Sequence, residues 1–498
     1  MLINISGSMG KYMNNKATNI SRSDRLLTLE NTKGIKTLLG EPKKAVIKLS
    51  IPMIIAMSVT TIYNFVDTLW VSGFGANWFP SSNLLEVGAD AVAAVGFVLP
   101  FFMTIISIST GLGVGCGSAI SRRIGANDKK GVDNVAIHSI ILTILTAIIF
   151  TIPLFLYSNI IFTSIGALEA ASMATSYGQI IFAGSIFLFF SYIANAILRG
   201  EGDAKRAMYA MMFGAGLNIF LDPVFIYIFR LGVTGAAYAT VLSMAITSSI
   251  LIYWLFFRKN TYVAFSFHDF KFNKEILIDI FRVGLPASIQ QLSMSFTMLI
   301  LIFIITFVSG DKGVTIYTIG WRVLSIAILP LLGMATAVVS VGGAAYGAHK
   351  YVKIKTVFLY SIKISLIIEI ILAVSTFFLA PIITSAFTTF DLGLRILSGD
   401  VILFLQISCL FYPGAAFGIM ASSIFQGTGK GTYALICTLL RTIILVPVFA
   451  FLFSYIFNLG LVGIWYAIVI ANIIGSIVSF TWCKLYIRNL IISNDVTI

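Results

Sequence analysis

An aspartate interrupts the apolar stretch GLNIFLDPVFIYIF at residues 216–229. Asp222 has Asn218 four residues before it, on the same helix face, and Pro223 directly after it. A carboxylate in apolar surroundings is costly unless it is paired, neutralised or used. The protonated acid can carry H⁺, and the ionised acid can hold Na⁺ together with amide and hydroxyl oxygens. If the stretch lies in a membrane, it predicts a site for a monovalent cation.

A second acid, Asp67, belongs to a polar stripe in the segment TTIYNFVDTLW. The stripe has i, i+3, i+4, i+7 spacing, which places its members on one helix face: Thr60, Tyr63, Asn64 and Asp67. Asp67 and Asp222 are expected at similar depth, so they could share one cavity. A second carboxyl nearby would raise the pKa of one of them, which suits uptake and release of a proton.

The elements that position these residues are membrane spans. The chain is 58% hydrophobic and 11% charged, whereas soluble domains have about 25% charged residues. The run 137–157 contains one His and no Asp, Glu, Lys or Arg, and about 20 such residues cross a bilayer. We therefore predict an all-α integral membrane protein with twelve transmembrane helices. They lie near 46–72, 89–120, 133–157, 170–199, 206–230, 234–257, 279–309, 315–346, 356–380, 397–426, 432–457 and 461–483.

Lys and Arg mark one side of the membrane, because they gather in alternate loops at 121–131, 199–206 and 349–355. Basic loops face the cytoplasm, so we predict a multi-pass protein of the plasma membrane with both termini cytoplasmic. Residues 1–44 are interpreted as a flexible cytoplasmic extension and residues 487–498 as a cytoplasmic tail. The net charge of +13 follows from this topology, and no nucleic-acid partner is expected.

The chain contains an internal repeat. LGVTGAAYAT at 231–240 recurs as LGLVGIWYAI at 459–468, and LDPVFIYIF recurs as LVPVFAFLF. In the second copy Val446 replaces Asp222, while the proline after it is kept. Packing therefore does not demand a carboxylate at this position, which strengthens the functional interpretation of Asp222.

Each copy contains six spans, so both copies have the same orientation in the membrane. This predicts two parallel six-helix bundles, an N-lobe at 45–257 and a C-lobe at 279–486, with a cytoplasmic connector at 258–278. Parallel repeats of this kind occur in secondary transporters, where the substrate path lies between the halves. Duplication favours a carrier over a channel.

Four motifs together resemble the MATE family, the multidrug and toxic compound extrusion transporters: YNFVDTLWV, GVGCGSAISRRIG, ILRGEGDAKRAM and NIFLDPVFI. The similarity covers nearly the whole chain from about residue 46. It implies a V-shaped pair of lobes that exports organic, often cationic, amphipathic compounds in exchange for H⁺ or Na⁺. It also implies that the protein is not an enzyme and needs no cofactor beyond the coupling ion. We expect a monomer in the lipid bilayer.

The resemblance also assigns residues. The cation-coupling site for H⁺ or Na⁺ would comprise Asp67, Asn218, Asp222 and Thr240. The residues expected to line the cavities are Tyr63, Asn64, Tyr177 and Asn195 in the N-lobe and Gln290 and Gln291 in the C-lobe. Pro52 matches the proline at which the first span bends in some family members. Some branches carry coupling acids in the C-lobe, where this chain has Gln290 and Gln291, so it fits the branch with its acids in the N-lobe.

Three alternatives remain at this stage. One is a nonconducting structural or receptor role, against which the loss of the acid in the second repeat speaks. A lipid-linked oligosaccharide flippase can share the two-lobe architecture, but it would need several Arg or Lys residues in the cleft for a pyrophosphate. A membrane-embedded enzyme would need a nucleophile and base, or a metal cluster, at matched depth. The third acid within a span, Glu369, has no polar neighbour on its helix face beyond Ser365, and we expect it to have a structural or lipid-interface role.

Overall fold

The computed structural model describes residues 32–73, 89–165, 170–258, 261–265, 270–388 and 396–495. Eleven helices in these ranges are long and apolar enough to cross a membrane. One of them, α9 (Lys274–Gly347), has 74 residues, and inside it Gly310 adopts φ 60° and ψ −153°. This conformation is open to glycine and ends the helical ladder, so α9 consists of two spans joined at Gly310. The described spans therefore number twelve, and the predicted all-α membrane fold is confirmed.

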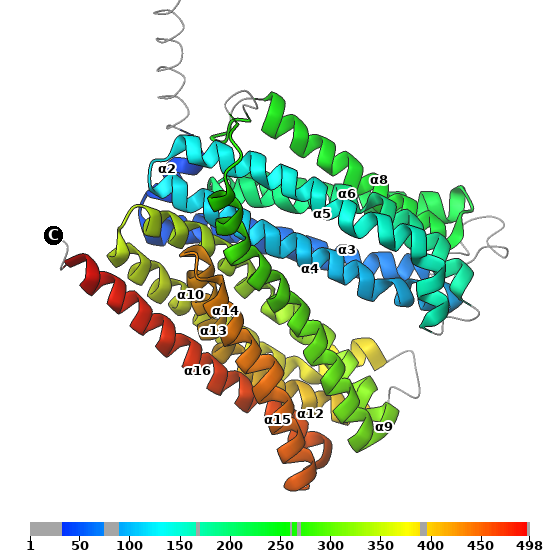
Figure 1. Ribbon diagram of the computed structural model, residues 1–498. Helices are drawn as coiled ribbons and strands as arrows, with labels where there is room; N and C mark the ends of the chain where they lie inside the picture. The colour runs from blue at the N-terminus through cyan, green and yellow to red at the C-terminus, as the bar shows by residue number, and fades with distance from the viewer. Residues whose placement is uncertain are drawn as a thin grey trace, which may run out of the picture.

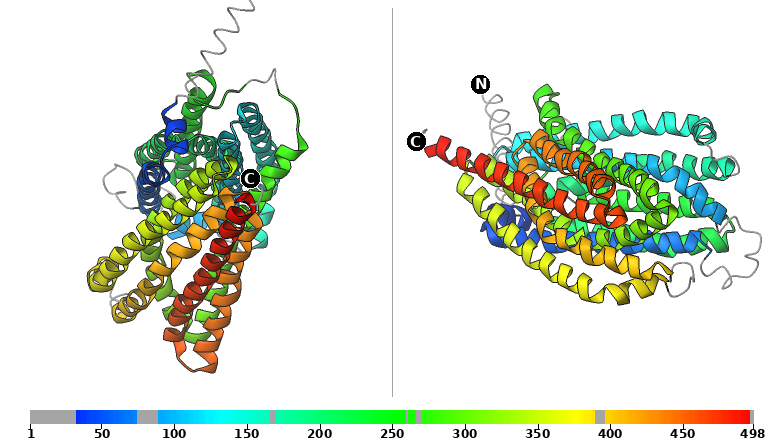
Figure 2. Two further views of the ribbon diagram at one scale, coloured as in Figure 1. Left: turned by 90° about the vertical axis from the view of Figure 1, so that its left-hand side faces the viewer. Right: turned by 90° about the horizontal axis from the view of Figure 1, so that it is seen from below.

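The spans form two bundles that converge at one end and diverge at the other, in a V shape (Figure 1). The first bundle consists of α3 (Pro42–Val71), α4 (Ala89–Gly125), α5 (Lys129–Ser164), α6 (Ala171–Gly200), α7 (Ala204–Pro223) and α8 (Gly232–Ile252). The second bundle consists of α9, α10 (Tyr351–Thr388), α12 (Ser398–Ser408), α13 (Tyr412–Gly427), α14 (Gly431–Leu439), α15 (Val446–Phe451) and α16 (Gly460–Asp495). The C-terminal end of α16 lies at the converging end (Figures 1 and 2).

Several spans contain a local departure from α-helix. After α7 the chain continues as π-helix over Val224–Ile228, and a 3₁₀ turn at Cys409–Phe411 separates α12 from α13. Pro223 and Pro413 stand beside these two breaks. Proline has no N–H to donate to the helix ladder, which explains why the regular ladder is interrupted there.

The apolar core follows the V shape. One cluster of buried side chains spans both bundles at the converging end, and it includes Leu112 and Cys116 of α4 with Ile280 and Met334 of α9. Two further clusters belong to the separate arms, one within the first bundle and one within the second. Among the described residues, the apolar core that both bundles share therefore lies where they converge, and each arm has a core of its own.

Glycines in α4 allow this close packing on two faces. A Cβ at Gly111 or Gly115 would collide with α9, whereas a Cβ at Gly113 or Gly117 would press on Ala196 or Tyr192 of α6. The i, i+4 spacing within each pair puts its two members on one face of the helix. Small residues at such positions let helix backbones approach in a membrane. One face of α4 thus joins the second bundle and another face packs inside its own bundle.

The segment 1–44 differs in part from the prediction of a flexible extension. Residues 1–31 lie outside the described residues, but Lys33–Leu39 form a short helix, α2, and α3 already begins at Pro42. Ile35 and Leu38 of α2 are buried in the core cluster of the converging end. A seven-residue helix is stabilised by such packing rather than by its own hydrogen bonds. At the other terminus α16 continues through the predicted tail to Asp495.

Candidate functional site

The two acids of the first bundle, Asp67 and Asp222, are brought together from two helices. Asp67 lies on α3 and Asp222 on the last turn of α7, directly before Pro223. Their carboxyl groups are hydrogen-bonded to each other, and Asp222 has no solvent-exposed surface. Two carboxyls in hydrogen-bonding contact need a proton between them, because two adjacent negative charges away from water repel strongly. Chemically, such a pair of carboxyls can take up a proton or bind a monovalent cation.

Asn218 and Thr240 complete this polar cluster. The Asn218 amide is oriented by its partners: its nitrogen donates to Asp222 Oδ2 at 2.9 Å, and its oxygen accepts from the Thr240 N–H and hydroxyl, both at 3.2 Å. Asn218 and Thr240 are 1% and 4% exposed. The cluster therefore offers carboxylate, amide and hydroxyl oxygens from α3, α7 and α8. Oxygen atoms of these kinds can coordinate Na⁺, and the carboxylates can also bind a proton.

Two tyrosines border the acid pair. Tyr63, one turn before Asp67 on α3, is half-buried and its hydroxyl is hydrogen-bonded with Thr240. Tyr177 of α6 is buried and interacts electrostatically with both acids. Asn64 is exposed on α3, so it turns away from the buried cluster although it belongs to the same stripe in sequence.

Asn195 lies elsewhere on α6 and is 6% exposed. Its amide nitrogen donates to the Ser191 carbonyl at 2.8 Å, whereas its buried side-chain oxygen has no hydrogen-bond partner among the described residues. The structure does not connect Asn195 by any hydrogen bond to the cluster of Asp67 and Asp222 in the described part of the chain. An unpartnered buried amide oxygen remains available to a ligand.

The two glutamines of the second bundle occupy different environments. The Gln290 amide donates to the Thr438 hydroxyl, and its oxygen accepts from the Gln426 amide at 2.8 Å. Gln291 is exposed. Gln290 therefore ties α9 to α13 and α14, and Gln291 is the one of the two whose side chain is accessible.

Pro52 is buried inside α3, which remains helical on both sides of it. Two residues further along, the backbone of Ile54 lies against Gly333 of α9, where a Cβ on the glycine would collide with it. Pro52 removes one hydrogen bond from the α3 ladder. The missing hydrogen bond makes α3 easier to bend at Pro52. Pro52 lies in the same helix as Asp67 and close to a contact between the bundles.

An ion-pair network that sequence reasoning missed joins the two bundles at the converging end. Asp279 of α9 binds Arg122 at 2.6 Å and Arg123 at 2.7 Å, both at the end of α4. Arg122 also donates to Ser118 and to the Gly427 carbonyl of α13. The basic run and the acid are visible in the sequence, but they are more than 150 residues apart, and no local pattern pairs them.

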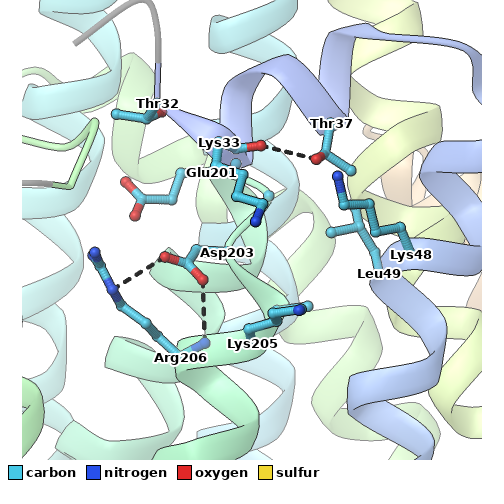
Figure 3. A pocket seen from close by; sticks show the side chains of 12 residues that line it. Thr32, Lys33, Thr37, Lys48, Leu49, Glu201, Asp203, Lys205 and Arg206 are labelled. Atoms are coloured by element: carbon cyan, nitrogen blue, oxygen red, sulfur yellow. Dashed lines mark hydrogen bonds and ion pairs between the residues drawn. The ribbon is translucent and has the colours of Figure 1, made fainter. Parts of the chain in front are cut away.

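A cavity of about 190 Å³ opens at the same end of the first bundle, between α2, the start of α3 and the turn from α6 to α7 (Figure 3). Glu201 in this turn is 3% exposed, and its carboxyl oxygen Oε2 accepts from the Val263 N–H at 3.1 Å. Burial raises the pKa of Glu201 to about 8. Val263 lies in the segment that connects the bundles, so Glu201 attaches that connection to the first bundle.

No group of three or more His, Cys, Asp or Glu side chains in the described residues could hold a metal ion.

Comparisons with known proteins agree with this architecture. The MatE family model matches residues 81–224 and 286–452. The multidrug export protein MepA of Staphylococcus aureus strain N315 is 28% identical over 435 residues, covering 86% of this chain and 90% of MepA. A crystal structure of MATE in complex with MaL6 has a TM-score of 0.88 at 45% identity, covering 92% of this chain and 99% of that one.

A further solved structure, the outward-facing conformation of a multidrug resistance MATE family transporter, has a TM-score of 0.87 at 46% identity and the same coverage. The twelve spans, the V shape and these matches lead to one assignment. The chain belongs to the MATE family of membrane transporters.

Proposed function

We propose that this protein exports amphipathic, often cationic, compounds by antiport against H⁺ or Na⁺. Its relatives include a multidrug export protein and a multidrug resistance transporter by name. The coupling cation would bind at Asp67, Asn218, Asp222 and Thr240 in the first bundle. The observation that carries the proposal is the contact between the carboxyl of half-buried Asp67 and that of fully buried Asp222.

The contact makes the cluster sensitive to cation occupancy. With a proton or Na⁺ in place the two carboxyls can stay together, and without it their repulsion drives them apart. Asp67 and Asp222 come from α3 and α7, so a change in their separation moves α3 relative to the rest of the first bundle. Pro52 lies 15 residues before Asp67 in α3, about 22 Å along the helix, and would act as the hinge.

Tyr63, Tyr177 and Asn195 would line the cavity of the first bundle, and Asn64 and Gln291 would present accessible polar groups to substrate. An organic cation would be attracted to the acid pair only while its charge is not neutralised. Substrate and coupling cation would therefore compete, and this competition is the basis of antiport.

The converging end carries the basic loops 121–131, 199–206 and 349–355, and we propose that it faces the cytoplasm with both termini. The V then opens to the outside, the conformation in which coupling cations enter and substrate leaves. Rocking of an N-lobe at 45–257 against a C-lobe at 279–486 would open the other side. One chain supplies both halves of the path, so we propose a monomer in the plasma membrane.

Efflux of a fluorescent organic cation from proteoliposomes tests the proposal. The wild type is compared with Asp222→Asn and Asp67→Asn under imposed H⁺ and Na⁺ gradients. We expect gradient-driven export by the wild type and its loss in both variants, and the effective gradient identifies the ion. Asp400→Asn serves as the control, because it removes an exposed carboxyl on α12 of the second bundle and leaves the acid pair intact.

If Asp222→Asn folds and exports like the wild type, the acid pair is structural and the proposed coupling is wrong. If none of the proteins moves organic cations but the wild type transfers a lipid-linked oligosaccharide across the bilayer, the flippase is the correct function.

A further inference from the structure

A buried acid in the second bundle has no hydrogen-bond partner in the part of the chain that the structure describes. Glu369 lies 18 positions after the first residue of α10, about 27 Å along the helix. Its side chain is 0% exposed, and neither carboxyl oxygen has a partner among the described residues. The structure thus places it inside the bundle and not at a lipid interface, which corrects one of the two roles expected from the sequence.

The surroundings of Glu369 are hydroxylic and uncharged. Ser365 lies one turn earlier on α10, and Ser408, at the end of α12, lies four residues before Tyr412. The hydroxyls of both serines are buried and also lack partners among the described residues. Tyr412 of α13 interacts electrostatically with the carboxyl, and Cys409 interacts with Tyr412. No charged side chain described on α3, α9, α12, α13 or α16 interacts with Glu369. A carboxylate here would be a buried charge with no counter-ion, so the arrangement favours a carboxyl that holds a proton.

The repeat shows that the fold does not need this acid. The helices α5 and α10 begin at Lys129 and Tyr351, which are equivalent in the two copies, so the counterpart of Glu369 is Ala147. Ala147 is also buried, at 1% exposed. The same position therefore packs well with a methyl group in the first bundle. In the second bundle the carboxyl of Glu369 makes no hydrogen bond among the described residues. Packing alone therefore does not explain why an acid stands at this position.

The position of Glu369 connects it to a helix break. The 3₁₀ turn Cys409–Phe411 interrupts the span formed by α12 and α13, and α10 packs directly against this turn. Short 3₁₀ stretches inside a helix often mark a hinge. Beyond the break, the far end of α13 carries the carbonyls of Gln426 and Gly427, which accept hydrogen bonds from Ser118 of the first bundle. One helix therefore links the surroundings of Glu369 to the junction of the bundles.

We propose that Glu369 is a second proton-binding site, in the second bundle, which holds a proton in the conformation described here. When the span formed by α12 and α13 changes its bend, Ser408, Tyr412 and Cys409 move relative to the carboxyl, and the proton is released. The ligand is a proton only, transferred between the carboxyl oxygen and water or a neighbouring hydroxyl. This site is separate from Asp67 and Asp222 and does not depend on their role.

Infrared difference spectroscopy on the full chain in lipid nanodiscs tests the proposal. The C=O band of protonated carboxyl groups is recorded between about pH 5 and 9, the range in which buried carboxyls titrate. The variants are Glu369→Gln, which has nearly the same shape, and Glu369→Asp, which keeps an acid. As the pH rises, we expect the wild type and Glu369→Asp to lose the C=O band of one protonated carboxyl. Glu369→Gln should lack this band at every pH. An unchanged titration in Glu369→Gln, or a Glu369 band that never titrates, would overturn the proposal.

A distance measurement separates this site from the acid pair. Spin labels at Tyr157→Cys of α5 and Phe378→Cys of α10 are exposed on the two arms, and the four native cysteines are buried. In the Asp67→Asn/Asp222→Asn background we expect a pH-dependent change of this distance, and its loss when Glu369→Gln is added.

Asp400→Asn on α12, an exposed acid on a helix that packs against α10, is the control and should leave the distance change intact. If the distance between the two labels does not respond to pH in the Asp67→Asn/Asp222→Asn background, protonation of Glu369 does not change the separation of the bundles and the proposal is refuted. This result is independent of whether Asp222→Asn retains gradient-driven export, so the two proposals can fail separately.

Discussion

Asp279 of α9 binds Arg122 of α4 at 2.6 Å and thereby joins the two bundles at the end where they converge. The arginine side chain is 10% exposed and the aspartate side chain 28%, so the pair is only partly in contact with water. Charge-assisted hydrogen bonds in such surroundings are stronger than neutral ones. The pair is therefore suited to hold the bundles in the V-shaped arrangement.

Removing the acid should weaken this junction. Asp279→Asn leaves Arg122 and Arg123 without their shared carboxylate, and we expect a loss of about 1–3 kcal/mol from the arrangement described here. Spin labels at Lys130→Cys and Lys355→Cys, both exposed at the converging end, should report a larger population of wide distances.

Glu41→Gln is the matched control for this measurement, because it breaks an exposed ion pair with Lys44 at the start of α3, within the first bundle. It should leave the distances unchanged. Identical distance distributions in wild type and Asp279→Asn would show that the ion pair does not control the separation of the bundles.

The glycines of α4 give a prediction with an internal control. A Cβ at Gly125 would collide with the Ala344 carbonyl of α9, whereas a Cβ at Gly96 would meet nothing within 4 Å. Gly125→Ala should therefore destabilise the protein by about 1–3 kcal/mol. Gly96→Ala should be neutral or stabilise it by up to about 1 kcal/mol, because alanine favours the helix. Thermal unfolding in detergent measures both, and equal midpoints would contradict the close approach of α4 and α9.

Glu201 should make stability depend on pH. Burial raises its pKa to about 8 in the folded protein from an ordinary value of 4.5. Between these values the folded state keeps a proton that the unfolded state has lost, so stability falls as pH rises, by at most about 1.4 kcal/mol per pH unit. Below pH 4.5 both states are protonated, and this dependence vanishes.

The Glu201→Gln variant isolates this effect. Its amide oxygen can still accept from the Val263 N–H, but the side chain does not titrate. We expect its unfolding midpoint to fall less than that of the wild type between about pH 5 and 8, the window set by the two pKa values. Glu41→Gln, at an exposed position, should behave like the wild type. Parallel pH profiles for wild type and Glu201→Gln would mean that Glu201 is ionised in the folded protein.

Gln290 and Gln291 should separate stability from substrate binding. Gln290→Ala removes hydrogen bonds to the buried Thr438 hydroxyl and the half-buried Gln426 amide, so we expect a loss of about 1–3 kcal/mol in unfolding free energy. Gln291→Ala changes an exposed side chain and should leave stability within about 0.5 kcal/mol. Its effect should appear in the concentration of organic cation that half-saturates efflux. A stable Gln290→Ala protein would show that this network does not hold α9.

The sequence by itself determined the elements and part of the site. Apolar runs of sufficient length predict the twelve spans, because every backbone polar group in a bilayer must be satisfied within its own helix. The repeat predicts the two bundles. Helix periodicity and matched depth predict that Asp67, Asn218 and Asp222 lie together, since all three positions follow from the regular rise of two helices.

Only the tertiary structure decided what depends on contacts between distant segments. The pairing of Asp279 with Arg122, the burial of α2 and the position of Glu201 beside Val263 each join segments that are far apart in the chain. The neighbours of Glu369 likewise come from other helices, so periodicity along α10 could not show that its carboxyl is unpartnered. Local patterns fix which face of a helix is polar, but the neighbour that this face meets is set by how the helices pack in three dimensions.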